Sequence, residues 1–264
     1  MAGYENIDFT LRYACARLTL RRPDKLNSFT AAMHAEVRAA IGRTRAEGAR
    51  VLLITGAGRA FCAGQDLSDR AMAGGSEGAV DLGASIERDY APLVRSLHAL
   101  PLPVVCAVNG AAAGAGANLA LACDLVIAAE SAYFYEPFCK LGLVPDTGGT
   151  FFLPRRIGTA RAMALTLLGE RLPAAEAAAC GLIWKCVPDA ELGPAVEALL
   201  QQLAQAPTRG LAAIKQALYA SAGNSLSEQL DLERDLNREL GHSADYREGV
   251  TAFLEKRAPR FTGA

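Results

Sequence analysis

The stretch Asn109-Gly-Ala-Ala-Ala-Gly-Ala-Gly-Ala-Asn118 joins a continuous apolar run, 104–108, to a helical pattern that carries Leu119 and Leu121. Backbone N–H groups at the start of such a helix favour developing negative charge. The stretch is not a dinucleotide fingerprint, because Asp124 comes too early to end a second strand, and it contains no Gly-Lys-Ser/Thr phosphate loop. Close packing of helix on strand through small residues is the simpler interpretation, and both interpretations can hold together.

Two further segments have a similar character. Phe61-Cys-Ala-Gly-Gln-Asp-Leu67 follows a strand-like run, and its small residues let N–H groups face a ligand closely, although an ordinary loop would look alike. In Leu141-Gly-Leu-Val-Pro-Asp-Thr-Gly-Gly-Thr150, Pro145 fixes the chain and the glycine pair opens the next helix. Asp146 stands where an N-cap is expected, and partial desolvation among apolar neighbours would instead suit it to act as a general base.

Outward from these segments, apolar runs alternate with helical patterns, which predicts parallel β-α-β units. Ser28 or Thr30 is expected to cap a helix that buries Met33, Val37 and Ile41. The other elements expected here are strands at 7–13, 14–20, 51–55, 104–108 and 124–128, a helix at 86–100 and a mobile loop at 69–83.

Past residue 190 the pattern becomes helical throughout. Helices are expected at 195–204, 211–222, 226–240 and 245–256. The third would begin with a capping box formed by Ser225 and Glu228. We therefore expect an α/β core, residues 1–189, that carries the functional site, and a helical C-terminal region, residues 190–264.

Composition excludes several classes of protein. The 264 residues are 51% hydrophobic and 21% charged, and 27 basic against 28 acidic residues leave a net charge of -1, which argues against a nucleic-acid-binding protein. No apolar run approaches the roughly 20 residues of a membrane span, and no signal peptide is recognisable. Seven scattered cysteines without a C-x-x-C pair indicate a reducing, cytoplasmic setting, and three isolated histidines indicate no metal site.

As an ordered set, four motifs resemble the crotonase family, the enoyl-CoA hydratase/isomerase superfamily. They are Arg22-Pro-Asp-Lys-Leu-Asn27, Cys62-Ala-Gly-Gln-Asp66, Asn109-Gly-Ala-Ala-Ala-Gly-Ala-Gly and Leu143-Val-Pro-Asp-Thr-Gly-Gly149. Each is weak alone, but together they are specific and span nearly the whole chain. The resemblance implies a crotonase-like α/β fold, with a core of repeated β-β-α units wound as a spiral and a helical C-terminal region through which chains assemble into homotrimers or homohexamers.

The resemblance also implies an acyl-CoA thioester as substrate, with coenzyme A as part of the substrate and no separate cofactor. The oxyanion hole would be the backbone N–H groups of Ala63 and Ala115, each worth roughly 3 kcal/mol of transition-state stabilisation. The residues implied to contact the substrate or its coenzyme A are Lys25, Leu26, Ala63, Gln65, Asp66, Leu67, Gly114, Phe138, Phe253 and Lys256. We expect Phe253 and Lys256 to share one face of the last helix, and docking of that helix is the alternative role.

Departures from the family pattern indicate which reaction to expect. Asn118 and Phe138 stand where hydratases of the family carry two glutamates, so ordinary hydration is disfavoured. Asp146 matches the position at which several isomerases of the family hold a catalytic aspartate. One carboxylate there can remove a proton alpha to the thioester and return it elsewhere. Glu136, two residues before Phe138, is a candidate second acid.

Within the family, the resemblance is closest to the ring-epoxide isomerases of phenylacetate degradation. It rests on residues 62–67, 81–83, 144–146 and 243–249. It implies that Asp146 takes an alpha proton from ring-1,2-epoxyphenylacetyl-CoA, that Ala63 and Ala115 hold the enolate, and that the epoxide opens towards oxepin-CoA. A general Δ3-Δ2 enoyl-CoA isomerase and a hydratase-like enzyme are alternatives. A non-catalytic acyl-CoA-binding protein is an alternative of another class.

Overall fold

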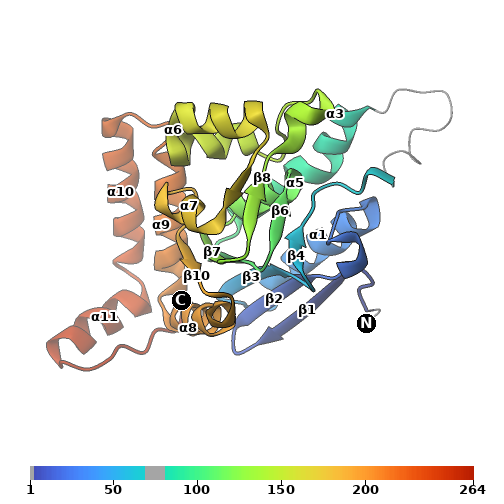
Figure 1. Cartoon of the computed structure of the whole chain (residues 1–264). Helices are drawn as coiled ribbons and strands as arrows, with labels where there is room; N and C mark the ends of the chain where they lie inside the picture. The colour runs from blue at the N-terminus through green and yellow to red at the C-terminus, as the bar shows by residue number, and fades with distance from the viewer. Residues whose placement is uncertain (1–2, 69–80) are drawn as a thin grey trace.

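The N-terminal hairpin begins the larger of two sheets in the computed structural model, which describes residues 3–68 and 81–264 (Figure 1). Strands β1 (Ile7–Arg12) and β2 (Cys15–Leu20) pair antiparallel, as expected. The other strands of this sheet run parallel to β2, and they are β3 (Val51–Gly56), β5 (Val104–Val108), β7 (Leu125–Ala129) and β10 (Lys185–Val187). The strand order is β1-β2-β3-β5-β7-β10. Because helices and a second sheet cover it, the central strands are almost entirely apolar.

A smaller sheet contains four strands of three residues each, in the order β4-β6-β8-β9. They are β4 (Ala60–Cys62), β6 (Ala111–Ala113), β8 (Tyr133–Tyr135) and β9 (Arg171–Pro173). Each of β3, β5 and β7 is followed after a few residues by β4, β6 or β8, so the chain passes from one sheet to the other and then into a helix. This repetition confirms the expected β-β-α spiral.

Helices connect the turns of the spiral. Thr30 caps α1 (Ala31–Ala46) by accepting a hydrogen bond from the backbone of Met33. The helix expected at 86–100 consists of α3 (Leu82–Ser85), a π-helical turn η2 (Ile86–Tyr90) and α4 (Ala91–Ala99). The remaining helices of this part are α5 (Ala115–Leu121), η3 (Pro137–Leu141), α6 (Gly149–Leu168) and α7 (Ala174–Ala179). Most of the loop expected at 69–83 lies outside the described residues, and Leu82 and Gly83 belong to α3.

Four helices end the chain, as the pattern predicted. They are α8 (Leu192–Gln205), α9 (Thr208–Ala220), α10 (Leu226–Leu240) and α11 (Ala244–Leu254). The capping box of Ser225 and Glu228 at the start of α10 is confirmed. In Figure 1, α9 and α10 lie beside each other, and α11 lies at the end of the molecule opposite α3. In the described part of the chain, no helix is both long and apolar enough to cross a membrane.

Two apolar cores pack against the larger sheet, one on each of its faces. One lies on the face towards α1, α4, α5 and the smaller sheet, and includes fully buried Leu18, Leu52 and Phe61. The other lies under α8, where Leu200 packs with Val51 and other residues of the opposite sheet face. The first helix of the C-terminal region therefore forms part of the core.

Candidate active site

The start of α5 brings the first glycine- and alanine-rich stretch next to the smaller sheet. Gly114, with φ 52°, turns the chain out of β6, and Ala115 begins the helix, so the Ala115 N–H lies in a first turn without an intrahelical partner. A Cβ on Gly116 would overlap the carbonyl oxygen of Cys62. Glycine is therefore required for α5 to lie against β4, which confirms the close packing of helix on strand, while stabilisation of negative charge by this stretch stays a prediction.

The segment after β4 lies directly beside this helix start. A Cβ on Gly64 would come 2.9 Å from the Ala113 carbonyl oxygen and 3.3 Å from the Ala115 nitrogen. Ala63, one residue earlier, therefore lies on the turn of the spiral next to Ala115. The structure thus places the two residues expected to form an oxyanion hole on adjoining segments.

The N–H group of Ala63 already has a partner in the structure. It donates a hydrogen bond to the carbonyl oxygen of Leu26 over 2.9 Å. Leu26 and Asn27 adopt left-handed backbone conformations, and the buried Asn27 side chain donates to the carbonyl oxygens of Ala57 and Ala60. These bonds hold the 22–27 loop against the 60–64 segment, so an oxyanion bound to Ala63 would share or replace the Leu26 carbonyl.

Asp146 lies in the loop before α6, next to α5, whose Asn118 contacts its backbone. Thr147 donates its hydroxyl proton to the Asp146 carboxylate over 2.9 Å. The expected N-cap role is wrong, because α6 begins at Gly149 with Gly148 in the cap position. The left-handed conformations of Thr147 and Gly148 separate the carboxylate from the helix, although the Gly149 N–H donates to the Asp146 carbonyl oxygen.

Asn118 links Asp146 to a second carboxyl group. Its side-chain nitrogen donates to the Asp146 carbonyl oxygen over 3.0 Å and to Glu136 Oε2 over 3.3 Å. Glu136 is only 1% exposed, and burial, with a further contribution from the charge of Asp146, raises its pKa to about 8. Asn118 and Glu136 are thus buried neighbours of the candidate base, and Glu136 is an acid that stays protonated at neutral pH.

Two substrate-contact candidates are placed close to the oxyanion segments. Phe138 is buried in η3, and its ring would lie 3.6 Å from a Cβ on Gly114. Gln65 accepts a hydrogen bond at Oε1 from the Tyr90 hydroxyl over 2.9 Å. Sequence reasoning missed Tyr90, because the π-helical turn that directs it to Gln65 leaves no periodic signal.

Three other substrate-contact candidates lie at the edge of this region. Lys25 and Leu67 are exposed, and so remain available for contact with coenzyme A. The carboxylate of Asp66 is instead occupied by Arg22, at 3.0 Å, and by the Ser68 hydroxyl. Asp66 therefore joins two motifs, and its part in substrate binding stays a prediction.

Phe253 and Lys256 are not brought to this region within one chain. Phe253 is 82% exposed on α11, which lies far from α5 in Figure 1. The prediction of one shared helical face is wrong, because α11 ends at Leu254 and Lys256 adopts the left-handed conformation that terminates helices. Any contact with coenzyme A at the described site would therefore have to come from another subunit.

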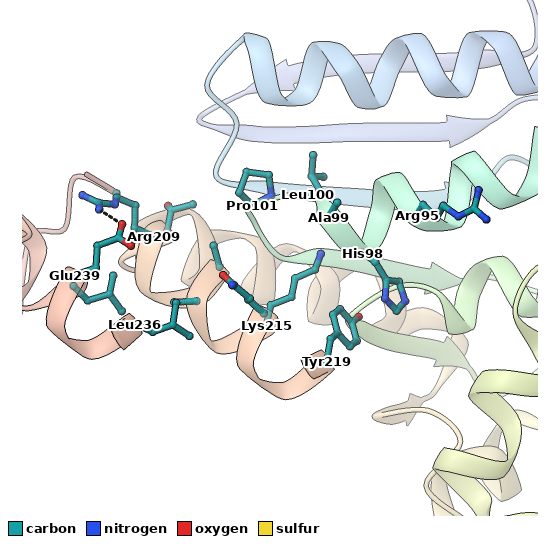
Figure 2. Close-up of a pocket in the computed structure, with 16 residues that line it drawn as sticks. Arg95, His98, Ala99, Leu100, Pro101, Arg209, Lys215, Tyr219, Leu236 and Glu239 are labelled. Atoms are coloured by element: carbon teal, nitrogen blue, oxygen red, sulfur yellow. Dashed lines mark hydrogen bonds and ion pairs between the residues drawn. The ribbon is translucent and has the colours of Figure 1, made fainter. Parts of the chain in front are cut away.

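A cavity of about 760 Å³ lies elsewhere, between the end of α4 and helices α9 and α10 (Figure 2). Lys215 and Tyr219 at its wall both bind the Asp124 carboxylate, while Arg209 pairs with Glu239. These cations are neutralised by neighbouring acids, and none of the four family-like motifs lines this cavity. Within the described ranges, no group of three or more His, Cys, Asp or Glu residues is arranged to hold a metal ion.

Comparisons with known proteins show which sequences and folds this chain resembles. The sequence model of the family described as enoyl-CoA hydratase/isomerase matches residues 11–264. The chain is 56% identical over 247 residues to the 1,2-epoxyphenylacetyl-CoA isomerase of Escherichia coli, covering 93% of this chain and 94% of that protein. It is 50% identical to a probable enoyl-CoA hydratase of Rhodobacter capsulatus, covering 99% of both chains. The solved structure of an enoyl-CoA hydratase subunit I from Geobacillus kaustophilus superposes with a TM-score of 0.91, at 36% identity and complete coverage of both chains.

Proposed function

Because the chain belongs to the enoyl-CoA hydratase/isomerase family, we propose that it isomerises an acyl-CoA thioester, with Asp146 as the catalytic base. The observation that carries this proposal is the distribution of acids around α5. By the family resemblance, Asn118 and Phe138 stand at the positions of the two hydratase glutamates, while Asp146 lies in the loop next to α5. A single carboxylate is suited to moving a proton between two carbons of one substrate.

The proposed substrate is ring-1,2-epoxyphenylacetyl-CoA, and the proposed product is oxepin-CoA. The 56% identity to the isomerase of Escherichia coli supports this choice. Asp146 takes a proton from the carbon next to the thioester, and the electron pair is delocalised onto the thioester oxygen. The bond beneath the epoxide oxygen opens to give the seven-membered ring, and the proton returns to a ring carbon. No atom is gained or lost and nothing is oxidised overall, so coenzyme A enters as part of the substrate and no separate cofactor is needed.

The enolate oxygen would bind the N–H groups of Ala63 and Ala115. Two main-chain donors aimed at a developing negative charge contribute roughly 3 kcal/mol each, and alanine at these positions does not weaken a backbone donor. Since the Ala63 N–H contacts the Leu26 carbonyl over 2.9 Å, we propose that the thioester oxygen takes over this donor when the substrate binds. Leu26 would then move with the 22–27 loop.

The remaining features of the proposal concern assembly and setting. Exposed Leu226, Phe253 and Leu254 in the C-terminal helices support assembly into homotrimers or homohexamers, because a monomer would leave them in water. All seven cysteines are free, which supports a reducing, cytoplasmic setting.

The proposed function is tested by turnover with purified protein. The ring-epoxide thioester, a Δ3-enoyl-CoA and a Δ2-enoyl-CoA are offered in turn, and products are identified by mass spectrometry and absorbance. We expect ring expansion, a slower Δ3-Δ2 shift, and little addition of water. Asp146→Asn should lower isomerisation by about 10²–10⁴-fold with binding retained, while Asp231→Asn, on the exposed face of α10, should not.

Three outcomes would contradict this proposal in whole or in part. Fast hydration of the Δ2-enoyl-CoA would favour the hydratase alternative, which the Rhodobacter capsulatus relative supports by its name. Binding of all three thioesters without alpha-proton exchange in D₂O would favour a non-catalytic acyl-CoA-binding protein. Near wild-type turnover by Asp146→Asn would show that another group is the base.

A further inference from the structure

The buried pair formed by Asn118 and Glu136 has more acceptors than donors. Asn118 is 0% exposed and Glu136 is 1% exposed. The two hydrogens of the Asn118 amide are both used, one towards Glu136 Oε2 and one towards the Asp146 carbonyl oxygen. Asn118 Oδ1 and Glu136 Oε1 are both buried and have no hydrogen-bond partner.

One proton would supply the donor that this pair lacks. Buried polar atoms without partners are costly, and a buried carboxylate without a cation is costlier still. In the described part of the chain, no ion pair involves Glu136. A protonated Glu136 can donate its O–H to the amide oxygen while the amide N–H donates to its other oxygen. An acid and a primary amide are complementary in this reciprocal arrangement.

The surrounding chain leaves room for this pair. A Cβ on Gly149 would lie within 2.7 Å of the Asn118 amide oxygen and nitrogen, so only glycine lets the start of α6 approach the amide. The same glycine donates its N–H to the Asp146 carbonyl oxygen over 2.9 Å. The backbone that carries Asp146 is thus held from two sides, by Gly149 and by Asn118.

We propose that Glu136 is a positioning residue, which as a neutral carboxylic acid pairs reciprocally with Asn118 and so fixes the backbone of Asp146 for proton transfer. This inference rests on the proposed function of Asp146. A neutral Glu136 also avoids a second negative charge beside Asp146, the acid whose charge acts on it. Burial raises the pKa of Glu136 to about 8, so the reciprocal pair would persist at neutral pH and be lost in alkaline solution.

Two substitutions at position 136 separate this role from simple space filling. Glu136→Gln keeps a donor and an acceptor at every pH, because a second amide can replace the acid in the pair. Glu136→Met has similar length but provides neither. We expect Glu136→Gln to keep kcat near the wild-type value at pH 7, and Glu136→Met to lower kcat about tenfold or more with little change in KM.

The pH profile is the readout that a merely structural residue would not change. The kcat of the wild type should fall above about pH 8, where Glu136 ionises, and that of Glu136→Gln should not. A wild-type profile in Glu136→Gln would overturn the proposal, and so would full activity in Glu136→Met. A loss in Glu136→Gln as large as that in Asp146→Asn would also overturn it, since Glu136 would then carry the transferred proton itself. If Glu136→Met fails to fold, the profiles of wild type and Glu136→Gln decide.

A second measurement separates this proposal from the function on which it rests. Alpha-proton exchange of phenylacetyl-CoA in D₂O reports proton transfer by Asp146 even if the ring-epoxide thioester is the wrong substrate. Infrared difference spectra of wild type minus Glu136→Gln report the protonated carboxyl band directly, without any turnover. A carboxylic acid band at pH 7 without alpha-proton exchange would contradict the proposed function alone. A carboxylate band at pH 7 would contradict the proposed role of Glu136.

Discussion

The guanidinium group of Arg22 lies 3.0 Å from the carboxylate of Asp66, and this ion pair joins two motifs that are 44 residues apart. Only 19% and 8% of the two side chains are exposed. Arg22 also donates to the carbonyl oxygen of Ser28, so it fixes the loop that carries Leu26. The pair therefore helps, together with the bonds of Asn27, to hold the loop whose Leu26 carbonyl accepts from the N–H of Ala63.

Arg22→Met should destabilise the fold by about 2 kcal/mol, because it leaves the Asp66 carboxylate largely buried without its cation. Arg43→Met is the matched control, since Arg43 pairs with Glu47 on the surface of α1 and such pairs contribute about 0.5 kcal/mol or less. Urea unfolding of both variants measures the difference. Equal effects would show that Asp66 finds another partner.

The stability of the protein should depend on pH through Glu136. Its pKa is about 8 in the folded chain, against 4.5 as the ordinary value, so the folded state retains a proton that the unfolded chain has lost. The stabilisation is complete below about pH 4.5, decreases as pH rises from there, and is fully lost above about pH 8.

Glu136→Gln lacks this dependence. Its melting temperature relative to the wild type should therefore rise between pH 5 and pH 8, with a difference in unfolding free energy of at most roughly 1.4 kcal/mol per pH unit. Thermal unfolding at three pH values measures it. A constant difference would show that Glu136 is already ionised at pH 5.

The double substitution Asn118→Glu and Phe138→Glu should give the protein a weak ability to hydrate a short enoyl-CoA. Asn118→Glu alone would place a second buried carboxyl group against Glu136, so we expect lower stability and little hydration from either single variant. Loss of absorbance of the conjugated thioester measures water addition. Absence of hydration in the double variant would indicate misplaced carboxylates, since a site must be held within about 0.5 Å. Fast hydration by the unmutated protein would contradict the isomerase assignment.

Phe253→Ser should weaken assembly and, if α11 completes the site of another subunit, coenzyme A binding as well. Light scattering at micromolar concentration and calorimetric titration measure the two effects. Tyr13→Ser is the control, because Tyr13 is 95% exposed in the N-terminal hairpin.

Lys256→Ala should weaken coenzyme A binding by a few-fold at most, as expected for one exposed charge. If light scattering shows that the wild type is a monomer, the premise that α11 contacts another subunit is wrong.

Point variants test the C-terminal helix better than deletion from residue 251 onward. Such a deletion would also remove Arg257, which contacts Glu248 at 2.6 Å, and Thr262, which donates to Asp245. The tail is thus part of the fold as well as a candidate contact. Loss of coenzyme A binding after this deletion would therefore not distinguish a lost contact with the ligand from a damaged fold.

Most of the larger sheet could be predicted because its strands are long and apolar. Val51–Gly56 and Val104–Val108 are buried runs that no exposed helix would carry. The smaller sheet could not, because its strands have three residues and Ala111–Ala113 has little β propensity. Those alanines are extended only because β6 lies between β4 and β8.

The segments of the candidate site could be named from the sequence, but the contacts between them could not. The family resemblance assigns the proposed oxyanion hole to the N–H groups of residues 63 and 115. It does not indicate that the Leu26 carbonyl would accept a hydrogen bond from one of them. Likewise, Asn118 appeared only as a missing glutamate, whereas it bonds to residues 18 and 28 positions away in the chain. Contacts over such separations depend on the tertiary fold and have no local signature.

The winding of the chain through two sheets has an evolutionary consequence. The N–H groups of residues 63 and 115, the proposed oxyanion hole, belong to the backbone, whose positions follow from the register of β4 with β6. The proposed base and the residues that surround it act instead through side chains, at 118, 136, 138 and 146, which substitution can change one at a time. If the proposed enolate-binding site is correct, a lineage with this fold can exchange one reaction for another and keep that site, since the inherited part lies in the main chain and the mutable part in the side chains around it.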